Sequence, residues 1–305
     1  MLRIPKTPSF KIEFLGGTPK NPSLKIQSLN IGIMNNLLLN IVWNVDPVAF
    51  AMGPIEVRWY GLFFAIGFLL AVSMLTKMFK AEKYPEEWAD KTFLYIIVGV
   101  VIGARLAHVF FYDWAYYKDH LSEIIMVWHG GLASHGGVLG GVLAMVMLSK
   151  KIMKKPLLWL GDRVFAVAGI TAACIRLGNL MNSEIYGCET TLPWGFKFLR
   201  DFPKLSADAV PVCHPTQIYE ALAYFIMFLV LQFLYWKKDF GKKYTGMLFG
   251  IGFIWVFLFR FIIEFIKNDQ SDFEADMILN MGQLLSIPFI IYGIYLIINA
   301  IKKKQ

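Results

Sequence analysis

The chain has 305 residues, of which 57% are hydrophobic and only 17% are charged. In soluble domains about a quarter of the residues are charged, so this composition excludes an ordinary soluble protein. The formal net charge of +8 would suit a nucleic-acid partner, but the lysines lie in short loops between apolar runs. We therefore expect no nucleic acid among the partners. The unbroken apolar runs also exclude a β-barrel, whose strands alternate apolar and polar residues.

Seven apolar segments are long enough to cross a bilayer as helices. They cover residues 59–78, 92–112, 132–148, 157–180, 218–236, 245–266 and 278–301. We predict an all-α polytopic membrane protein whose seven transmembrane helices form one domain over residues 58–301. Asp162 and Arg163, inside the fourth span, are expected to form a structural pair.

The lysines predict how the chain lies in the membrane. Fifteen of them fall in residues 77–91, 150–155, 237–243 and 302–304, which all lie at the same end of the spans. The loops at the other end hold only five basic residues. By the positive-inside rule, the C-terminus and its basic tail (302–305) are cytoplasmic and the N-terminus is outside.

Three segments outside the spans have their own character. Residues 1–33 lack an apolar run of signal-peptide length, so they are predicted to be a disordered leader or, as we prefer, to precede a true start at Met34. Residues 34–57 are predicted to be an N-terminal arm on the outer side. Residues 183–212 are too long for a simple connection and are predicted to form a small head, with a lid as the alternative.

The three cysteines are too few for a disulfide scaffold. Cys174 lies inside a span, where we expect its side chain to pack against neighbouring helices. Cys188 and Cys213 share one external loop, so a disulfide between them is one alternative. His129 and His135 are six residues apart, which does not place them on one helical face. We predict no metal and no cofactor.

Polar side chains of six spans lie at a similar depth, near the outer ends. A rise of about 1.5 Å per residue converts position in a span into this depth. The group comprises Tyr60, Arg105, His108, His135, Arg176, the run 214–220, and Arg260 with Glu264. One buried polar residue is often a packing device, but six helices with polar residues at one depth predict a polar chamber.

The residue types in this chamber suit an anionic lipid. The arginine fork binds phosphate through two hydrogen bonds and keeps its charge, so Arg105, Arg176 and Arg260 suit a phospholipid headgroup. His135 is the expected general base.

Carboxylates and glycines surround these groups. Glu264 is expected to tether Arg260, and Glu220 to tether Arg105. The pair Gly136 and Gly137 could let a substrate approach the backbone, whereas the pair that follows at 140–141 is expected to serve helix packing.

Two other classes of protein compete with an enzyme. A transporter would place polar residues through both halves of the membrane, but the inner half is apolar apart from residues 162 and 163. A lipid-binding scaffold would need the arginines but would have little use for a histidine among glycines.

Five motifs in order resemble the prolipoprotein diacylglyceryl transferase family. They are residues 58–61 (RWYG), 134–137 (SHGG), 176–187 (RLGNLMNSEIYG), 214–220 (HPTQIYE) and 260–264 (RFIIE). The resemblance covers residues 43–282. Ile175 and Cys213 depart from the family pattern, in which Gly and Arg are common at these two positions.

The resemblance implies an enzyme of the bacterial inner membrane with its active site near the periplasmic side. Its reaction would transfer a diacylglyceryl group from phosphatidylglycerol to the lipobox cysteine of a preprolipoprotein signal peptide. The implied catalytic residues are His135, Arg260 and Tyr60. Arg176, Asn179, Glu184, Gly187 and Glu264 are implied to bind phosphatidylglycerol or to matter for function, and we add Arg105, Gly136 and Gly137 to the lipid-binding set.

Overall fold

The computed structural model describes residues 40–267 and 279–303, so the predicted leader lies outside the described residues. Within these ranges seven helices are long and apolar enough to cross a membrane, which confirms the predicted architecture. They are α2 (Trp59–Ala81), α3 (Glu87–Phe111), α5 (Ser134–Met147, continued by a π-helical turn, Leu148–Met153), α6 (Leu157–Met181), α7 (Thr216–Lys238), α9 (Met247–Ile263, continued by a 3-10 turn, Glu264–Ile266) and α10 (Met281–Lys302).

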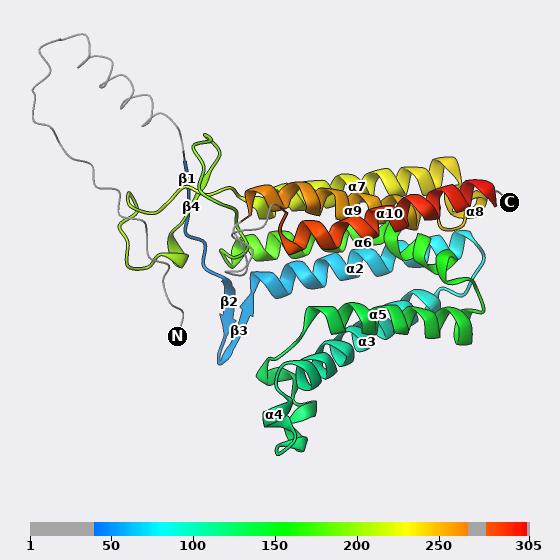
Figure 1. Cartoon of the computed structure of the whole chain (residues 1–305), viewed down its shortest axis with the longest axis horizontal. Coiled ribbons are helices and arrows are strands. Elements are labelled where there is room, and N and C mark those ends of the chain that lie inside the picture. Colours follow the sequence, from blue (N-terminus) through cyan, green and yellow to red (C-terminus); the bar gives the residue numbers. More distant parts are fainter. Residues whose placement is uncertain (1–39, 268–278, 304–305) are drawn as a thin grey trace, which may run out of the picture.

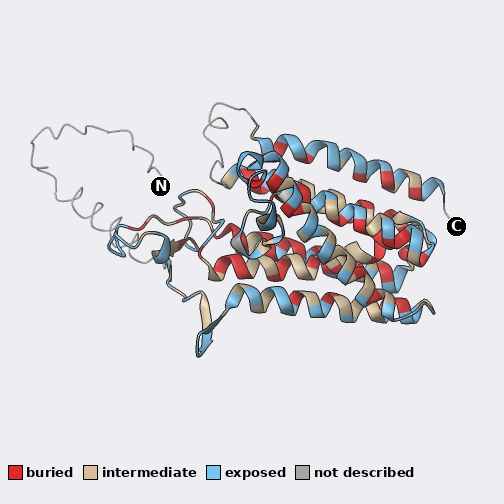
Figure 2. Cartoon of the chain, turned by 90° about the horizontal axis from the view of Figure 1, so that it is seen from below, coloured by how far each residue is buried: buried red, intermediate tan, exposed pale blue. Residues whose placement is uncertain are grey.

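The two central helices are α6 and α7. About half of the apolar stretch of each is buried (44% and 50%), against 17% for α3. Helix α6 packs on α2, α7 and α9, while α10 packs on α9. Figure 2 shows the same division, with buried residues on the inner helix faces and exposed residues along the faces that we expect lipid to cover.

Helices α3 and α5 form a separate hairpin that contacts the bundle mainly through α2. Figure 1 shows this hairpin diverging from α2 toward the end that carries α4 (Trp114–Tyr117). Its two helices touch backbone to backbone: a Cβ on Gly103 would lie 2.2 Å from the Gly136 carbonyl oxygen, and one on Gly140 would lie 2.0 Å from that of Gly99. Small residues at this spacing permit such close packing.

The two ends of the bundle differ in structure. The lysine end carries residues 77–91, 150–155 and 237–243, with the short helix α8 (Phe240–Lys243). The opposite end, called the motif end below, carries a hairpin of β2 (Val48–Met52) and β3 (Ile55–Arg58). There β1 (Ile41–Trp43) also pairs in parallel with β4 (Phe196–Phe198).

A small second core covers the motif end of α6. Phe196, Phe198 and Cys213 pack with Leu180, the second-last residue of α6, and Trp43 packs against this cluster. The indole Nε1 of Trp43 donates to the Leu180 carbonyl oxygen at 2.9 Å. Residues 183–212 and β1 therefore pack together over this end of the bundle.

The predicted pairing of Asp162 with Arg163 is wrong. Arg163 pairs instead with Glu82, the residue that follows α2 (Nη2–Oε2, 2.7 Å), and both side chains are buried. The Asp162 carboxylate accepts from the backbone N–H groups of Gly246 (2.6 Å) and Phe249 (2.9 Å) at the start of α9. A carboxylate is favourable there because the first N–H groups of a helix have no partner within the helix.

Candidate active site

The centre of the site is a buried carboxylate that two cations share. Glu220 of α7 lies 3.2 Å from Arg176 Nε through Oε2 and 3.1 Å from Lys267 Nζ through Oε1. The Glu220 and Lys267 side chains are only 2% and 9% exposed, whereas Arg176 is 22% exposed. Since two cations share one carboxylate, this group carries an excess of positive charge, and Arg176 is its accessible member.

A chain of side-chain amides orients Arg176. Its Nη1 donates to Asn179 Oδ1 at 3.2 Å, and Asn179 Nδ2 donates to Glu184 Oε1 at 2.8 Å. Asn182 Nδ2 donates to the same oxygen at 3.1 Å. Asn179 thus links Arg176 to the Glu184 carboxylate of the same motif.

The turn after α6 has a strained backbone. Ser183 and Ile185 have φ of +56° and +61°, in the left-handed region that a β-branched residue rarely adopts. The first residues of α7 hold this turn: Gln217 Nε2 donates to the Glu184 carbonyl at 2.7 Å, and Thr216 Oγ1 donates to that of Ile185 at 2.8 Å. The two longest motifs are therefore parts of one structure.

Gly187 is the point where the segment that follows the last motif packs against them. It is buried, and a Cβ there would lie 2.3 Å from the Ile266 carbonyl oxygen. Gly187 N donates to the His214 carbonyl at 2.8 Å, and Cys188 N donates to that of Ile266 at 2.9 Å. Gly187 is therefore a point where two backbone segments cross in close contact.

Two further predicted residues border this cluster. The Tyr60 ring packs on Gly178, where a Cβ would lie 2.9 Å from Tyr60 Cδ2, so α2 supplies its aromatic side chain two residues from Arg176 on α6. Arg260 is exposed on α9. The buried Tyr224 hydroxyl of α7 forms a hydrogen bond with Arg176 and is close enough to Arg260 to interact with its charge.

Glu264 does not take its expected partner. Within the described residues it forms no ion pair with Arg260. Its buried carboxylate lies against α10 instead, where a Cβ on Gly282 would be 2.8 Å from Glu264 Oε1. The contact lies in the first turn of α10, whose N-terminus favours a negative charge. Glu264 therefore docks α10 onto the end of α9.

His135 lies apart from the Arg176 cluster. Its ring is exposed at the start of α5, beside a cavity of about 440 Å³ whose walls come from the α3–α5 hairpin and the residue before α5. Gly136 and Gly137 both face α3, where they permit close packing, and Gly136 also lines the cavity beside His135. The hairpin and the bundle therefore present the histidine and the arginines separately.

Arg105 is a structural residue, contrary to expectation. It is 3% exposed, and all three of its nitrogens donate to backbone carbonyls. Nε bonds Ile124 (2.8 Å), Nη2 bonds Glu123 (2.7 Å), and Nη1 bonds Gly130 and Gly131 (2.7 and 3.2 Å). The predicted tether through Glu220 is likewise wrong. Arg105 holds the loop that leads into α5 and so positions the start of the histidine motif.

Lys267 is the site residue that the sequence analysis missed, because it was counted as a loop lysine. It follows directly after the 3-10 turn that ends the α9 span and has an extended backbone, so helical spacing does not relate it to Arg260.

In the part of the chain that the structure describes, no three His, Cys, Asp or Glu side chains lie together as a possible metal-ion site. All three cysteines are free thiols, so the possible pairing of Cys188 with Cys213 is not formed. Burial, and next the charge of Glu189, raises the pKa of the Cys213 thiol to about 11. Burial lowers the pKa of the His214 imidazole.

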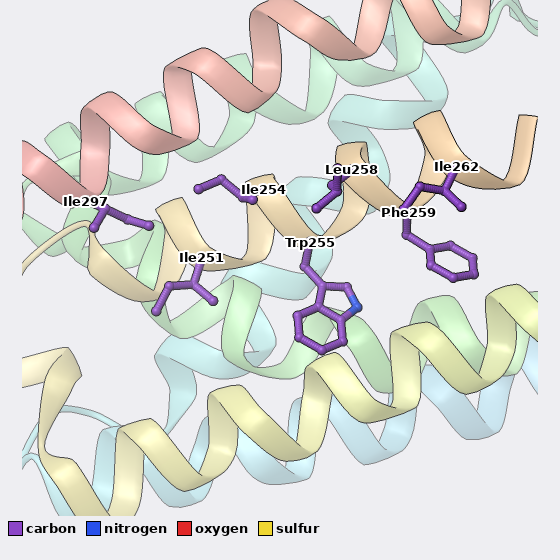
Figure 3. A pocket seen from close by; sticks show the side chains of 7 residues that line it. All are labelled: Ile251, Ile254, Trp255, Leu258, Phe259, Ile262 and Ile297. Atoms are coloured by element: carbon purple, nitrogen blue, oxygen red, sulfur yellow. The ribbon is translucent and has the colours of Figure 1, made fainter.

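Two apolar grooves lead toward the arginines. One, of about 260 Å³, lies between α2, α3 and α6 and reaches Ile175, the residue before Arg176. The other, of about 380 Å³, runs along α9 to Phe259 and Ile262 on either side of Arg260 (Figure 3). In this groove Trp255 points toward α7, where its Nε1 donates to the Ala223 carbonyl at 2.9 Å.

Comparison with known proteins agrees with this arrangement. Residues 47–299 match the family model described as prolipoprotein diacylglyceryl transferase. Three relatives are named phosphatidylglycerol–prolipoprotein diacylglyceryl transferase. That of Porphyromonas gingivalis is 47% identical over 269 residues (86% of this chain, 95% of the relative). That of Chloroherpeton thalassium is 47% identical over 265 residues (87% of this chain, 96% of the relative). That of Bacteroides fragilis is 44% identical over 285 residues (89% of this chain, 99% of the relative). The chain therefore belongs to the prolipoprotein diacylglyceryl transferase family.

Proposed function

We propose that this protein transfers the diacylglyceryl group of phosphatidylglycerol to the lipobox cysteine of a preprolipoprotein and releases glycerol 1-phosphate, the first step of bacterial lipoprotein maturation. The observation that carries the proposal is the sharing of Glu220 by Arg176 and Lys267. A site with an excess positive charge and one accessible arginine suits the phosphate of an anionic lipid.

The chemistry places charge where this cluster lies. The cysteine sulfur forms a bond to the glycerol carbon that bears the phosphate, and the carbon–oxygen bond to the phosphate breaks. The electron pair of that bond goes to the phosphate oxygen, so negative charge grows on the leaving group in the transition state. Arg176, held in place by Asn179 and Glu220, can stabilise this charge without reorganising.

The thiol proton needs an acceptor, because the thiolate is the nucleophile. We assign this role to His135, whose ring is exposed at the motif end of the hairpin. The donor lipid, lying between hairpin and bundle, would then meet the histidine on one side and Arg176 on the other. We assign Tyr60 to positioning the donor and Arg260 to a second contact with its phosphate.

The surrounding structure suits the two substrates. The groove between α2, α3 and α6 has room for part of an acyl chain and ends beside Arg176. Residues 183–212, packed over the same end of α6, are the proposed docking place of the signal peptide, with the free lipobox cysteine directed between the hairpin and the bundle.

We propose that the lysine end faces the cytoplasm and the motif end the periplasm, because fifteen lysines lie at the former. A membrane-impermeant maleimide tests this orientation in intact spheroplasts. A single cysteine introduced at Lys118, beside α4, should react from outside, whereas one introduced at Lys302 should react only after the membrane is permeabilised. The opposite pattern would overturn the orientation.

The reaction is tested by incubating the purified protein with phosphatidylglycerol and a lipobox peptide and measuring the mass of the peptide. We expect a gain of one diacylglyceryl unit that requires the peptide cysteine. His135→Gln should lower the rate about 100-fold or more, as expected for loss of a general base. His120→Gln, an exposed histidine stacked on Tyr116, is the matched control and should be active. No gain of mass by a folded protein would contradict the proposal.

A further inference from the structure

A second polar cavity lies at the lysine end of the bundle. It measures about 500 Å³ and is bounded by the turn after α2, the start of α6 and the connection from α8 to α9. Arg163 lines it, and Arg176 lies thirteen residues farther along α6, which separates the cavity from the candidate active site by about 20 Å. The cavity therefore belongs to a different region of the molecule, at the end shown with the C-terminus in Figure 1.

The charges around this cavity are not balanced. Arg163 and Glu82 neutralise one another, since the guanidinium reaches both carboxylate oxygens (2.8 and 2.7 Å from Nη2) and the Tyr235 hydroxyl donates to the same carboxylate. Three further cations line the cavity: Lys83, Lys155 and Lys242.

These three lysines lack carboxylate partners. Among residues 40–267 and 279–303, no Asp or Glu oxygen lies within 4.0 Å of their Nζ atoms, although neighbouring lysines at the same end do form such pairs. The neighbours are Lys80 with Glu86, Lys91 with Glu87, and Lys243 with Asp239. Three positive charges thus surround one cavity without a counter-ion from the protein.

Two aromatic rings contact Lys155, and a tight turn sets the backbone of Lys83. Lys155 Nζ lies 4.6 Å from the centroid of the Tyr84 ring and 5.8 Å from that of Trp159, both of which line the cavity. Lys83 has a φ of +62°, an unusual conformation for a lysine, and the bond from Tyr84 N to the Phe79 carbonyl (2.9 Å) closes the turn around it. Lys155 Nζ therefore lies against two rings of the cavity, and the turn fixes the backbone from which the exposed Lys83 side chain extends.

From these observations we propose that the cavity binds the headgroup of an anionic phospholipid of the leaflet at the lysine end. The phosphate lies among Lys83, Lys155 and Lys242, and the glycerol and upper acyl chain lie against Trp159 and Tyr84. Basic pockets between membrane helices bind anionic headgroups, and Tyr and Trp collect at headgroup depth. This placement favours a lipid over a free anion.

The binding is tested by native mass spectrometry of the purified full-length protein in detergent, titrated with phosphatidic acid. The cavity variant is Lys83→Gln/Lys155→Gln/Lys242→Gln. The matched control, Lys150→Gln/Lys151→Gln/Lys237→Gln, removes the same charge from exposed lysines at the same end that do not line the cavity. Because both triples lose three lysines, effects of net charge or membrane orientation are common to them.

We expect the wild type and the control to retain one anionic lipid more than the cavity variant, whose affinity should fall at least tenfold. Lys155→Glu alone should lose the lipid and Lys155→Arg should keep it. Phosphatidylcholine should bind all variants equally. The melting temperature without lipid shows that the cavity variant is folded. Equal binding of phosphatidic acid by the cavity variant and the control triple would overturn the proposal. It would also be overturned if inorganic phosphate raised the melting temperature of the wild type as much as phosphatidic acid does, because that result would indicate a site for a free anion.

Discussion

Substitution of Gly187 by alanine tests whether the three motifs are held together by one close crossing. The new Cβ would lie 2.3 Å from the Ile266 carbonyl oxygen, 2.8 Å from Thr216 Cγ2 and 2.9 Å from His214 Cβ. All three distances are shorter than real Cβ contacts, and the neighbours are mainly backbone or first side-chain atoms. The segment after α9 must therefore separate from residues 187–188 by about 1 Å to restore van der Waals contact, as overpacking of a tight core requires.

This separation has an energetic and a functional consequence. Overpacking costs about 1–3 kcal/mol, and weakening the hydrogen bonds of Gly187 N and Cys188 N adds roughly 1 kcal/mol each. Lys267 follows Ile266 directly, so its distance to Glu220, now 3.1 Å, should increase as well. A displacement of about 1 Å near reacting groups can lower the rate roughly 100-fold.

The assay measures the melting temperature and the rate of lipobox-peptide modification in the same detergent. Gly61→Ala is the matched control, because its Cβ would have no heavy atom within 4 Å and it lies in the first turn of α2 at the same end. We expect Gly187→Ala to melt earlier and react 10- to 100-fold more slowly, and Gly61→Ala to resemble the wild type. Unchanged melting and rate in Gly187→Ala would refute the crossing.

Three other predictions follow from buried groups. Glu220→Gln should destabilise the protein by about 3–5 kcal/mol, because a buried cation loses its partner. Adding Lys267→Met should restore part of this stability in thermal unfolding; additive losses would argue against the shared pair. Because burial raises the Cys213 pKa to about 11, its thiolate is about 100-fold scarcer at pH 8 than that of a thiol with pKa 9. In a variant without the other two cysteines, the rate of alkylation should rise about tenfold per pH unit from 7 to 10, and a pH-independent rate would contradict this. Arg105→Gln should increase hydrogen exchange in residues 121–131, where four carbonyl hydrogen bonds are lost; unchanged exchange there would refute the positioning role.

The seven spans could be predicted because each depends only on local length and hydropathy. The depth of Arg176, Arg260 and His135 in the membrane follows from their positions along these spans. All three residues lie toward the motif end, as expected. Partners could not be predicted in this way. Glu220 could have faced any arginine at its depth, and the choice of Arg176 depends on the packing of α6 on α7.

The glycines were ambiguous for a similar reason. A glycine beside a histidine suits both substrate access and close helix packing, and the local sequence does not distinguish the two. For Gly136 the neighbours on α3 are Gly103 and Ala107, so it permits close packing, and it also lines the cavity beside His135. For Gly187 the close neighbour is a carbonyl 79 residues away in the chain, which no local pattern contains.

The separation of the histidine from the arginines has a physical basis in how each is held. The hairpin is closed by backbone contacts between α3 and α5 and by the Arg105 hydrogen bonds, so His135 is fixed relative to α3 rather than to α6. Arg176 is fixed within the bundle by Glu220 and Asn179. An apolar groove lined by α2, α3 and α6 lies where the hairpin meets the bundle and ends at Ile175. A lipid that fills this groove would bring an anionic headgroup to Arg176 and would give the two units a common surface. Under the proposed function, the donor lipid itself therefore completes the active site.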